Sequence, residues 1–202
     1  MSELLNIEIN NKEIIDTILS NISKLFINRQ YIDETYKIPN DIIKEIHLNK
    51  TAELILNDKK ISINILMYEI KSITSNSSID EYLRKNTDTL KFIIAKGFTK
   101  KTYKQINDEY SNAEIFEISD FLEDIPSKYF IPIHKLVIGK ELEELLQSFN
   151  PKEFGKIHMT DKMSRYYGGK IGDIFRIERF NINSGISVYY RVVIQSNLDI
   201  FN

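Results

Sequence analysis

The sequence predicts an α/β protein of two domains, and three observations lead to this prediction. Segments with apolar residues at helical spacing alternate with short β-prone runs along the first part of the chain. Pro126 and Pro132 bracket a segment that cannot continue a helix, which places a domain boundary near residue 128. At 202 residues the chain can bury one good core or two small ones. We therefore expect a mixed α/β domain over residues 1–128 and a small α+β domain over residues 129–202.

The first domain begins with the clearest helical pattern. Isoleucine, leucine and phenylalanine recur three and four residues apart between Asn11 and Arg29, which is typical of an amphipathic helix. Gly97 is expected to end a short, fully apolar strand that is buried on both faces. The remaining elements are expected at Pro39–His47 (helix), 51–56 and 61–68 (strands joined by a polar hairpin), 79–84 (helix), 90–95 (the apolar strand), 99–110 (helix) and 113–118 (strand).

The second domain is expected to start with a strand at Ile133. A helix over residues 140–149 follows and stops before Pro151, because proline cannot continue it. A helical turn is expected near Met163. A closing hairpin then pairs residues 173–180 with residues 186–194, because two β-prone runs flank a short polar segment that contains glycine.

Composition excludes several classes of function. The net charge is −2, so the protein as a whole does not attract polyanions, and nucleic-acid contact requires a local basic patch. The chain has no cysteine, which excludes disulfides, zinc-finger ligation and thiol catalysis. We expect neither a signal peptide nor a membrane span, since no basic region precedes an apolar core and no apolar run is long enough.

Between His134 and Ile194, several motifs follow one another in a specific order. A strand that begins with His134 precedes a helix rich in Glu and Leu. Then come Asp161 with Arg165-Tyr166-Tyr167-Gly168, the run Gly172–Arg179, and Tyr190-Arg191 followed by Val193. This order resembles the C-terminal assembly domain of RNA polymerase subunit 5, a domain that in archaea forms a complete polymerase subunit by itself. One departure is Lys162, where the family pattern has proline.

The resemblance implies that the second domain docks on the largest polymerase subunit. The interface residues that it implies are His134, Asp161, Arg165, Tyr166, Tyr167, Gly168, Arg176 and Arg191. Arginine and tyrosine are enriched at the centres of interfaces, which agrees with this role. The residues by themselves also fit a turn that ends a helix and places one tyrosine in the core, because glycine commonly follows a helix.

The first domain resembles the family's N-terminal jaw domain, which has a nuclease-like fold. The resemblance places the loop after its apolar strand beside downstream double-stranded DNA. The residues expected near DNA are Lys96, Thr99, Lys100, Lys101 and Lys104. Lysines at a helix start offer weak, sequence-independent phosphate contact. The same run also fits a solvated helix face.

Two other classes of function stay open at this point. Asp58 and the run Glu69-Ile70-Lys71 resemble the carboxylates and lysine of Mg²⁺-dependent nucleases, although such residues also occur by chance. A free-standing adaptor that binds another protein is the second alternative. The three histidines are too scattered for a metal site, and the run from Gly168 to Gly172 is interpreted as a tight turn rather than a phosphate loop.

The favoured hypothesis is a non-catalytic structural subunit of a multisubunit DNA-directed RNA polymerase. Its expected partners are the largest subunit, the other polymerase subunits and downstream DNA, with no cofactor, metal, membrane or small-molecule substrate. Frequent isoleucine and asparagine suggest an AT-rich genome, and the divergent jaw is similar to versions from large DNA viruses. We expect the protein to lie with the polymerase inside the cell, in the virion and host cytoplasm if viral, and otherwise in the nucleus.

Overall fold

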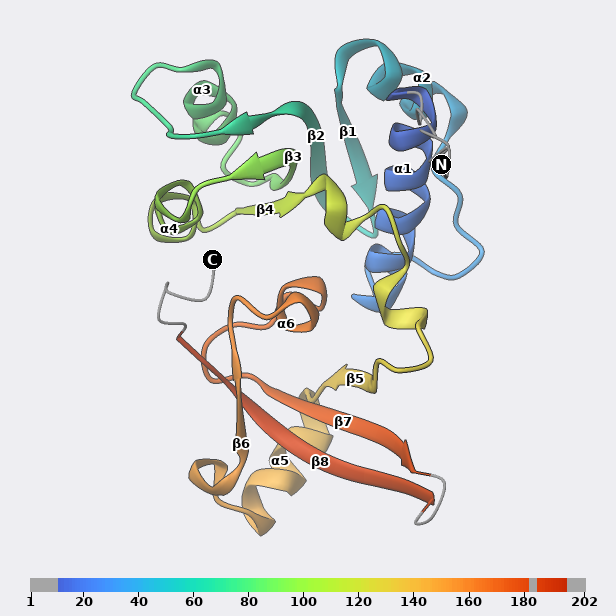
Figure 1. Cartoon of the computed structure of the whole chain (residues 1–202), viewed down its shortest axis with the longest axis vertical. Coiled ribbons are helices and arrows are strands. Elements are labelled where there is room, and N and C mark those ends of the chain that lie inside the picture. Colours follow the sequence, from blue (N-terminus) through green and yellow to red (C-terminus); the bar gives the residue numbers. More distant parts are fainter. Residues whose placement is uncertain (1–10, 182–184, 196–202) are drawn as a thin grey trace, which may run out of the picture. The chain divides into compact units, whose positions relative to one another are not determined.

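The computed structural model describes residues 11–181 and 185–195. The chain divides into two compact units, the first ending at Glu123 and the second beginning at Asp124 (Figure 1). Each unit contains one mixed sheet with helices, as the sequence predicts. No helix in the described ranges combines the length and apolar composition needed to cross a bilayer.

Unit 1 is built on a four-stranded sheet with the strand order β1-β2-β3-β4. The predicted hairpin of β1 and β2 is confirmed as an antiparallel pair, whereas β2, β3 and β4 are parallel. The elements are α1 (Asn11–Asn28), α2 (Asn40–Asn49), β1 (Thr51–Leu56), β2 (Lys59–Ile70), α3 (Ser78–Arg84), β3 (Leu90–Phe98), α4 (Lys100–Glu109) and β4 (Ala113–Glu117). The parallel strands need crossover connections, and α3 and α4 provide them.

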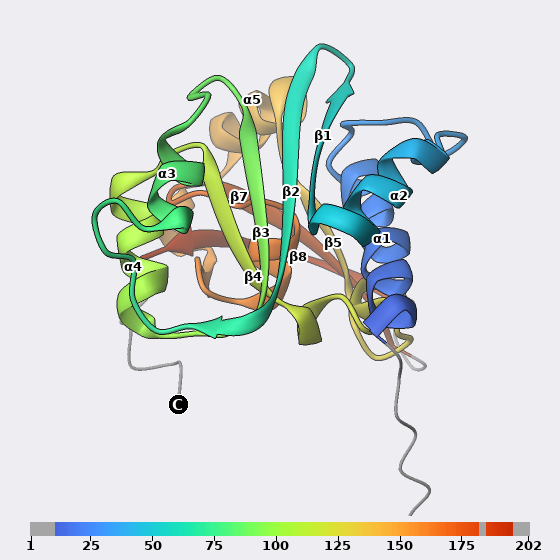
Figure 2. The same ribbon diagram turned by 90° about the horizontal axis from the view of Figure 1, so that it is seen from above.

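Helices cover both faces of this sheet. In Figure 2, α3 and α4 lie on one side of the sheet, and α1 with α2 lies on the other. Side chains of neighbouring strand residues point to opposite faces. Accordingly, Phe92 of β3 packs edge-on against Phe26 of α1, while the Lys91 Nζ donates a hydrogen bond to the Leu83 carbonyl oxygen of α3. Burial on both faces explains the apolar run from Phe92 to Ala95, and Lys91 is buried with its Nζ hydrogen-bonded.

Several boundaries differ from the sequence prediction by one to three residues, and two of these differences have a clear physical reason. Gly97 does not end β3, because it continues the pairing with β2 opposite Glu69, and the strand ends at Phe98. Ile118 belongs to a 3-10 turn (Ile118–Asp120) rather than to β4. In that turn, the backbone N–H of Glu117 donates to the Asp120 carboxylate, and this local bond competes with extension of the strand.

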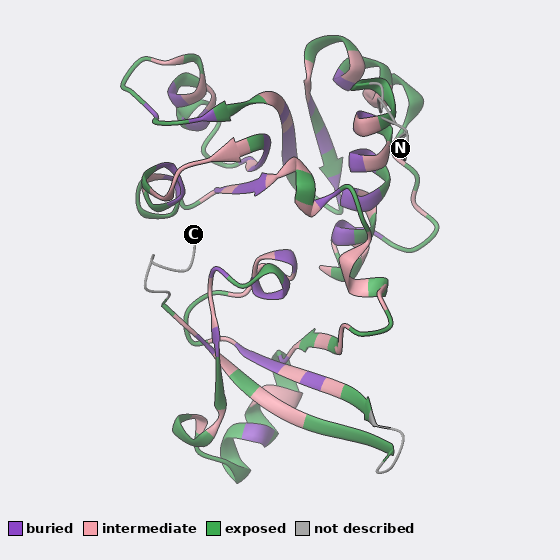
Figure 3. Ribbon diagram, viewed as in Figure 1, coloured by how far each residue is buried: buried purple, intermediate pink, exposed green. Residues whose placement is uncertain are grey.

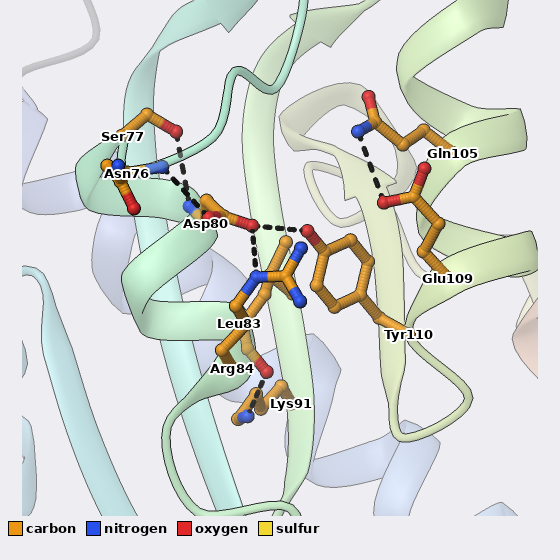
Figure 4. Close-up of polar contacts among 9 residues, drawn as sticks. All are labelled: Asn76, Ser77, Asp80, Leu83, Arg84, Lys91, Gln105, Glu109 and Tyr110. Atoms are coloured by element: carbon orange, nitrogen blue, oxygen red, sulfur yellow. Dashed lines mark hydrogen bonds and ion pairs between the residues drawn. The ribbon is translucent and has the colours of Figure 1, made fainter.

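A polar network joins α3 to the end of α4 (Figure 4). The Asp80 carboxylate accepts hydrogen bonds from the Tyr110 hydroxyl, the Arg84 Nε and the Asn76 backbone N–H. These bonds, that of Tyr110 first, hold the pKa of Asp80 below its ordinary value. Burial and the hydrogen bond to Asp80 raise the pKa of Tyr110 to about 12. The network fixes α4, the helix that carries the basic residues identified above.

A bidentate ion pair joins the end of α1 to β4. Arg29 Nη1 lies 2.7 Å from Glu114 Oε1, and Nη2 donates to Oε2 at 2.8 Å. The Arg29 side chain is 3% exposed, whereas that of Glu114 is 38% exposed. Burial acts to lower the pKa of the guanidinium, but Glu114 and Tyr31 outweigh it, so the pKa of Arg29 is raised. The guanidinium also lies over the ring of Phe92, 5.5 Å from its centroid.

Unit 2 has a four-stranded sheet with the strand order β5-β7-β8-β6. Its elements are β5 (Ile133–Leu136), α5 (Gly139–Ser148), β6 (Gly155–His158), α6 (Lys162–Tyr166), β7 (Ile174–Asn181) and β8 (Gly185–Ile194). The predicted closing hairpin is confirmed as the antiparallel pair β7 and β8, although residues 182–184 of its turn lie outside the described residues. The strand β6, which pairs in parallel with β8, was not predicted from the sequence.

The two faces of this sheet pack against different helices. The α5 face, which carries Ile174, Arg176, Glu178 and Phe180 of β7, packs against α5 through a cluster centred on Ile174. The opposite α6 face carries Phe175 and Ile177 and packs against the segment around α6. Figure 3 shows that burial is concentrated where these clusters lie and falls toward the joined ends of β7 and β8.

Candidate functional site

Asp161 has a local role as the N-terminal cap of α6. Its Oδ1 accepts hydrogen bonds from the backbone N–H groups of Met163 at 2.8 Å and Ser164 at 3.4 Å. A carboxylate at this position satisfies N–H groups that have no partner within the helix. The Lys162 that departs from the family pattern occupies the first helical position, so the helix forms without the proline. A direct interface role for Asp161 stays a prediction.

The aromatic turn after α6 packs largely inward. Tyr166 is 9% exposed, and its ring meets that of Tyr167 in a T-shaped arrangement at 5.2 Å. Tyr167 in turn packs at 6.2 Å against Phe175 on the α6 face, and burial raises the pKa of its hydroxyl. Tyr166 thus occupies the core position that the residues themselves suggested for one tyrosine, while Tyr167 is half-buried. Their predicted contact with a partner stays a prediction.

Glycines give the turn its close packing. Gly168 has a φ of +70°, which L side chains rarely adopt. A Cβ placed on Gly169 would lie 2.8 Å from the Phe175 ring and 2.9 Å from the Ser164 hydroxyl oxygen, so only glycine fits. Gly172, at a φ of +94°, leads into β7. This run is therefore a tight turn, as expected.

The other predicted interface residues divide between the two faces of the sheet. His134 lies opposite Ile177 on the α6 face, packs edge-on against Phe175, and contacts the Pro132 carbonyl oxygen through Nδ1 at 2.7 Å. Burial, the largest effect, lowers the pKa of His134. Arg191 shares this face and lies over a tyrosine ring. Arg176 lies on the α5 face and forms an ion pair with Glu178. The structure therefore does not bring the predicted set into one surface.

The predicted DNA-facing residues occupy one short segment, the end of β3 and the first five residues of α4. Thr99 caps α4, and its Oγ1 lies 3.2 Å from the Thr102 backbone N–H. The same hydroxyl lies 2.9 Å from the Lys71 carbonyl oxygen, which links the end of β2 to this segment. Exposed lysines of this segment are Lys96, Lys101 and Lys104, while Lys100 is half-buried. The structure adds the exposed Lys71 to this group of lysines. The sequence had suggested a role for Lys71 only within a nuclease-like motif.

The structure separates the residues of the possible nuclease motif. Asp58 lies in the β1–β2 turn with a φ of +65°, a position that suits Asp. Glu69 lies at the other end of β2, opposite Gly97. A straight strand rises about 3.3 Å per residue, so nearly the whole length of β2 lies between the two residues and they do not form one site. Among the described residues, no group of three or more His, Asp or Glu side chains could hold a metal ion.

Exposed apolar residues at the joined ends of β7 and β8 were not identified from the sequence. Phe180 is 74% exposed, and Ile186, directly opposite on β8, is 66% exposed. The signal available in the sequence was the pairing of two large apolar residues beside a hairpin turn, where polar residues are usual.

The two units present an exposed cluster of lysines and exposed apolar strand ends, and surfaces of this kind are typical of proteins that bind other macromolecules. Residues 124–193 match the family model of RNA polymerase Rpb5, C-terminal domain. Over 201 residues, the chain is 29% identical to DNA-directed RNA polymerase subunit 5 of Acanthamoeba polyphaga mimivirus, covering 95% of this chain and 97% of that protein.

Two cellular relatives match different parts of the chain. Subunit 5B of DNA-directed RNA polymerases IV and V of Arabidopsis thaliana is 27% identical over 141 residues, covering 68% of this chain and 65% of that protein. The DNA-directed RNA polymerase subunit Rpo5 of Methanocaldococcus jannaschii is 36% identical over 67 residues, covering 32% of this chain and 86% of that protein. The chain belongs to the RNA polymerase subunit 5 family. It is thus a non-catalytic polymerase subunit.

Proposed function

We propose that unit 2 of this chain docks on the largest subunit of a DNA-directed RNA polymerase, while unit 1 flanks the downstream DNA. The observation that carries this proposal is the match to the archaeal Rpo5 proteins. About one third of this chain covers 86% of the Methanocaldococcus protein, which has little beyond this domain. A small subunit of this kind assembles through the domain itself, so the corresponding unit here is the natural attachment point.

The role of unit 1 follows from the cluster of lysines at its surface. Lys96, Lys101 and Lys104 are exposed within nine residues of one another, and Lys71 lies beside the cap of α4. The family's jaw domain, with its nuclease-like fold, lies near DNA, and lysines without base-reading partners contact phosphates irrespective of sequence. The contact is therefore weak, salt-sensitive and independent of DNA sequence.

The protein works where its polymerase works. The mimivirus relative supports a viral source, for which these sites are the virion and the host cytoplasm. No cofactor or metal takes part, and the nucleotidyl-transfer chemistry belongs to other subunits.

Affinity purification of the tagged full-length chain from its native source tests the docking. We expect the two large polymerase subunits to copurify in stoichiometric amounts. Recovery with a different protein, and without these subunits, would instead support the free-standing adaptor.

Charge reversal tests the contact with DNA. In the purified polymerase, Lys101→Glu with Lys104→Glu is expected to weaken crosslinking of unit 1 to downstream DNA and to reduce the salt slope by about 0.9 for each phosphate that is no longer neutralised. Lys44→Glu, an exposed lysine of α2, serves as the control. Equal crosslinking by the unchanged chain, the double variant and the control would show that these two lysines do not contact DNA, and absence of crosslinking in the unchanged chain would show that unit 1 does not lie beside it.

A further inference from the structure

The strand β2 carries an extra residue near its end. Leu66 pairs with Ala95 of β3, and three residues later Glu69 pairs with Gly97, which is only two residues after Ala95. One residue of β2 therefore has no counterpart on β3, which is the arrangement of a β-bulge. Bulges shift the register of the strand that follows them, and they are frequent beside functional sites, where they redirect side chains.

The bulge decides which residue of the chain lies beside the start of α4. Ile70 pairs with Phe98, so Lys71 comes level with Thr99, the cap of α4. In an unbroken register, Lys71 would instead come level with Lys100. The shifted pairing thus brings the exposed Lys71, from the connection between β2 and α3, to the segment that carries the predicted DNA-facing residues.

Two threonines of α4 and its cap, Thr99 and Thr102, hold the end of β2 in place, and we name this pair the threonine lock. Thr102 is 0% exposed, and its Oγ1 donates to the Ile70 carbonyl oxygen at 3.2 Å. The Thr99 backbone N–H donates to the same oxygen, and the Thr99 Oγ1 donates to the Lys71 carbonyl oxygen at 2.9 Å. Two consecutive carbonyl groups are therefore fixed to the first turn of α4.

The hydroxyl groups of the threonine lock are used inside unit 1. A threonine hydroxyl has a single proton to donate. That of Thr99 is directed at the Lys71 carbonyl oxygen or at the Thr102 Oγ1, 3.0 Å away, and the Thr99 Oγ1 also accepts from the Thr102 backbone N–H. While these bonds are made, Thr99, which was predicted to lie near DNA, has no proton to offer a phosphate. Its contribution is to hold the backbone of Lys71.

The side chain of Lys71 is available to an external anion. Among the described residues, no ion pair engages Lys71, Lys101 or Lys104. Glu69, the exposed acid two residues before Lys71, lies opposite Gly97 and forms no ion pair with a described residue either. Three exposed ammonium groups thus come from two separate connections of the chain, and the threonine lock joins these connections.

We propose that Lys71 contacts a backbone phosphate of double-stranded DNA, and that Thr99 and Thr102 are positioning residues that hold Lys71 beside the lysines of α4. This inference rests on the proposed function and adds a contact from the connection between β2 and α3. The lysine side chain is flexible, so the place of its backbone sets which phosphate it reaches. Fixing two connections in advance also reduces the ordering cost of binding.

The test uses the polymerase assembled with this chain on DNA that contains a downstream duplex. Acylation by acetic anhydride, measured by mass spectrometry with and without DNA, reports the protection of each lysine separately. Thr102→Val removes the hydroxyl group, keeps the shape of the side chain and leaves every charge in place. Thr102→Ser retains the hydroxyl group. Thr17→Val is the matched control, since the Thr17 Oγ1 donates to the Glu13 carbonyl oxygen within α1.

We expect DNA to protect Lys71, Lys101 and Lys104 in the unchanged chain. Thr102→Val is expected to lose the protection of Lys71 and to keep that of the other two lysines, because the Ile70 carbonyl group loses a partner while the cap of α4 is unchanged. The serine variant and the control are expected to keep all three. Since no charge changes, a loss confined to Lys71 does not come from a weaker overall field.

Each other outcome decides against a specific step. Protection of Lys101 and Lys104 without Lys71 in the unchanged chain would overturn the inference and leave the proposed function intact. Full protection of Lys71 in Thr102→Val, or an equal loss at all three lysines, would refute the positioning role. Absence of protection at all three in the unchanged chain would instead refute the proposed function.

Thermal melting of the free chains verifies that each variant folds. If Thr102→Val does not fold, Thr99→Val gives a second reading, because it removes the bond from the Thr99 Oγ1 to the Lys71 carbonyl oxygen. The same loss of protection at Lys71 is then required, and unchanged protection there would contradict the proposal.

Discussion

The ion pair between Arg29 and Glu114 permits a quantitative prediction, because its two partners differ in burial. Replacing Glu114 by Gln removes the counter-charge of a guanidinium that is 3% exposed. Removing one partner of a fully buried pair costs about 3–5 kcal/mol. Glu114 is 38% exposed, so water screens part of the interaction, and Tyr31 still supports the guanidinium. We therefore expect Glu114→Gln to lower the free energy of unfolding by about 2 kcal/mol.

Replacing the arginine of this pair is expected to lower the free energy of unfolding by less than replacing the glutamate. Arg29→Met removes the buried charge itself and leaves a carboxylate that water can reach, so the expected loss is about 1 kcal/mol, mostly from packing over Phe92. Urea unfolding of both single variants and of the double variant gives these values and their coupling. For a chain of this size, about 2 kcal/mol corresponds to a decrease of roughly 4–8 °C in Tm.

Two results would refute the reasoning. One is a cost of Arg29→Met that exceeds the cost of Glu114→Gln, since the difference in exposure requires the opposite order. The other is a coupling energy near zero in the double-mutant cycle, since the two side chains share two hydrogen bonds.

Three further predictions concern the network, the turn and pH. The pKa of Asp80 is lowered in the folded state, so the stability that this carboxylate contributes is present above about pH 4 and is lost as the pH falls through the folded pKa. Asp80→Asn should therefore reduce the loss of unfolding free energy at acid pH. An unchanged dependence on pH would contradict this. Gly169→Ala should destabilise unit 2 by about 1–3 kcal/mol through overpacking, measurable by urea unfolding followed by hydrogen exchange, and a neutral effect would show that the turn can shift. The pKa of His134 is lowered in the folded state, so the stability that the neutral side chain contributes is present above about pH 6.5 and decreases as the pH falls below that value. His134→Phe should remove this dependence of Tm on pH.

Elements whose residue pattern is set by near neighbours in the sequence were predictable. The first helix has seven buried residues at helical spacing, and both antiparallel hairpins join neighbouring runs across short polar segments. Thr99 or Lys100 was expected near the start of the helix, and in the structure Thr99 is the cap and Lys100 the first helical residue. In each case, the determining interactions lie within a few residues of one another.

Elements that depend on distant partners were not predictable. β6 has four residues, Gly155–His158, and becomes a strand only because β8 pairs with it. The orientation of Tyr166 and Tyr167 also depends on tertiary structure, since aromatic residues suit a core and an interface equally. The exposure of Phe180 depends on where α5 ends its cover of the sheet, which no pattern in β7 itself reveals.

The strand order of unit 2 has a consequence for biosynthesis. β8 lies between β7 and β6, so the last strand of the described residues is a central one. β6 has no neighbour in the described sheet until β8 has been translated, whereas the sheet of unit 1 is complete once Glu117 has left the ribosome. Unit 1 can thus fold during translation, while nascent unit 2 keeps its strand edges open for longer and depends on late, long-range pairing.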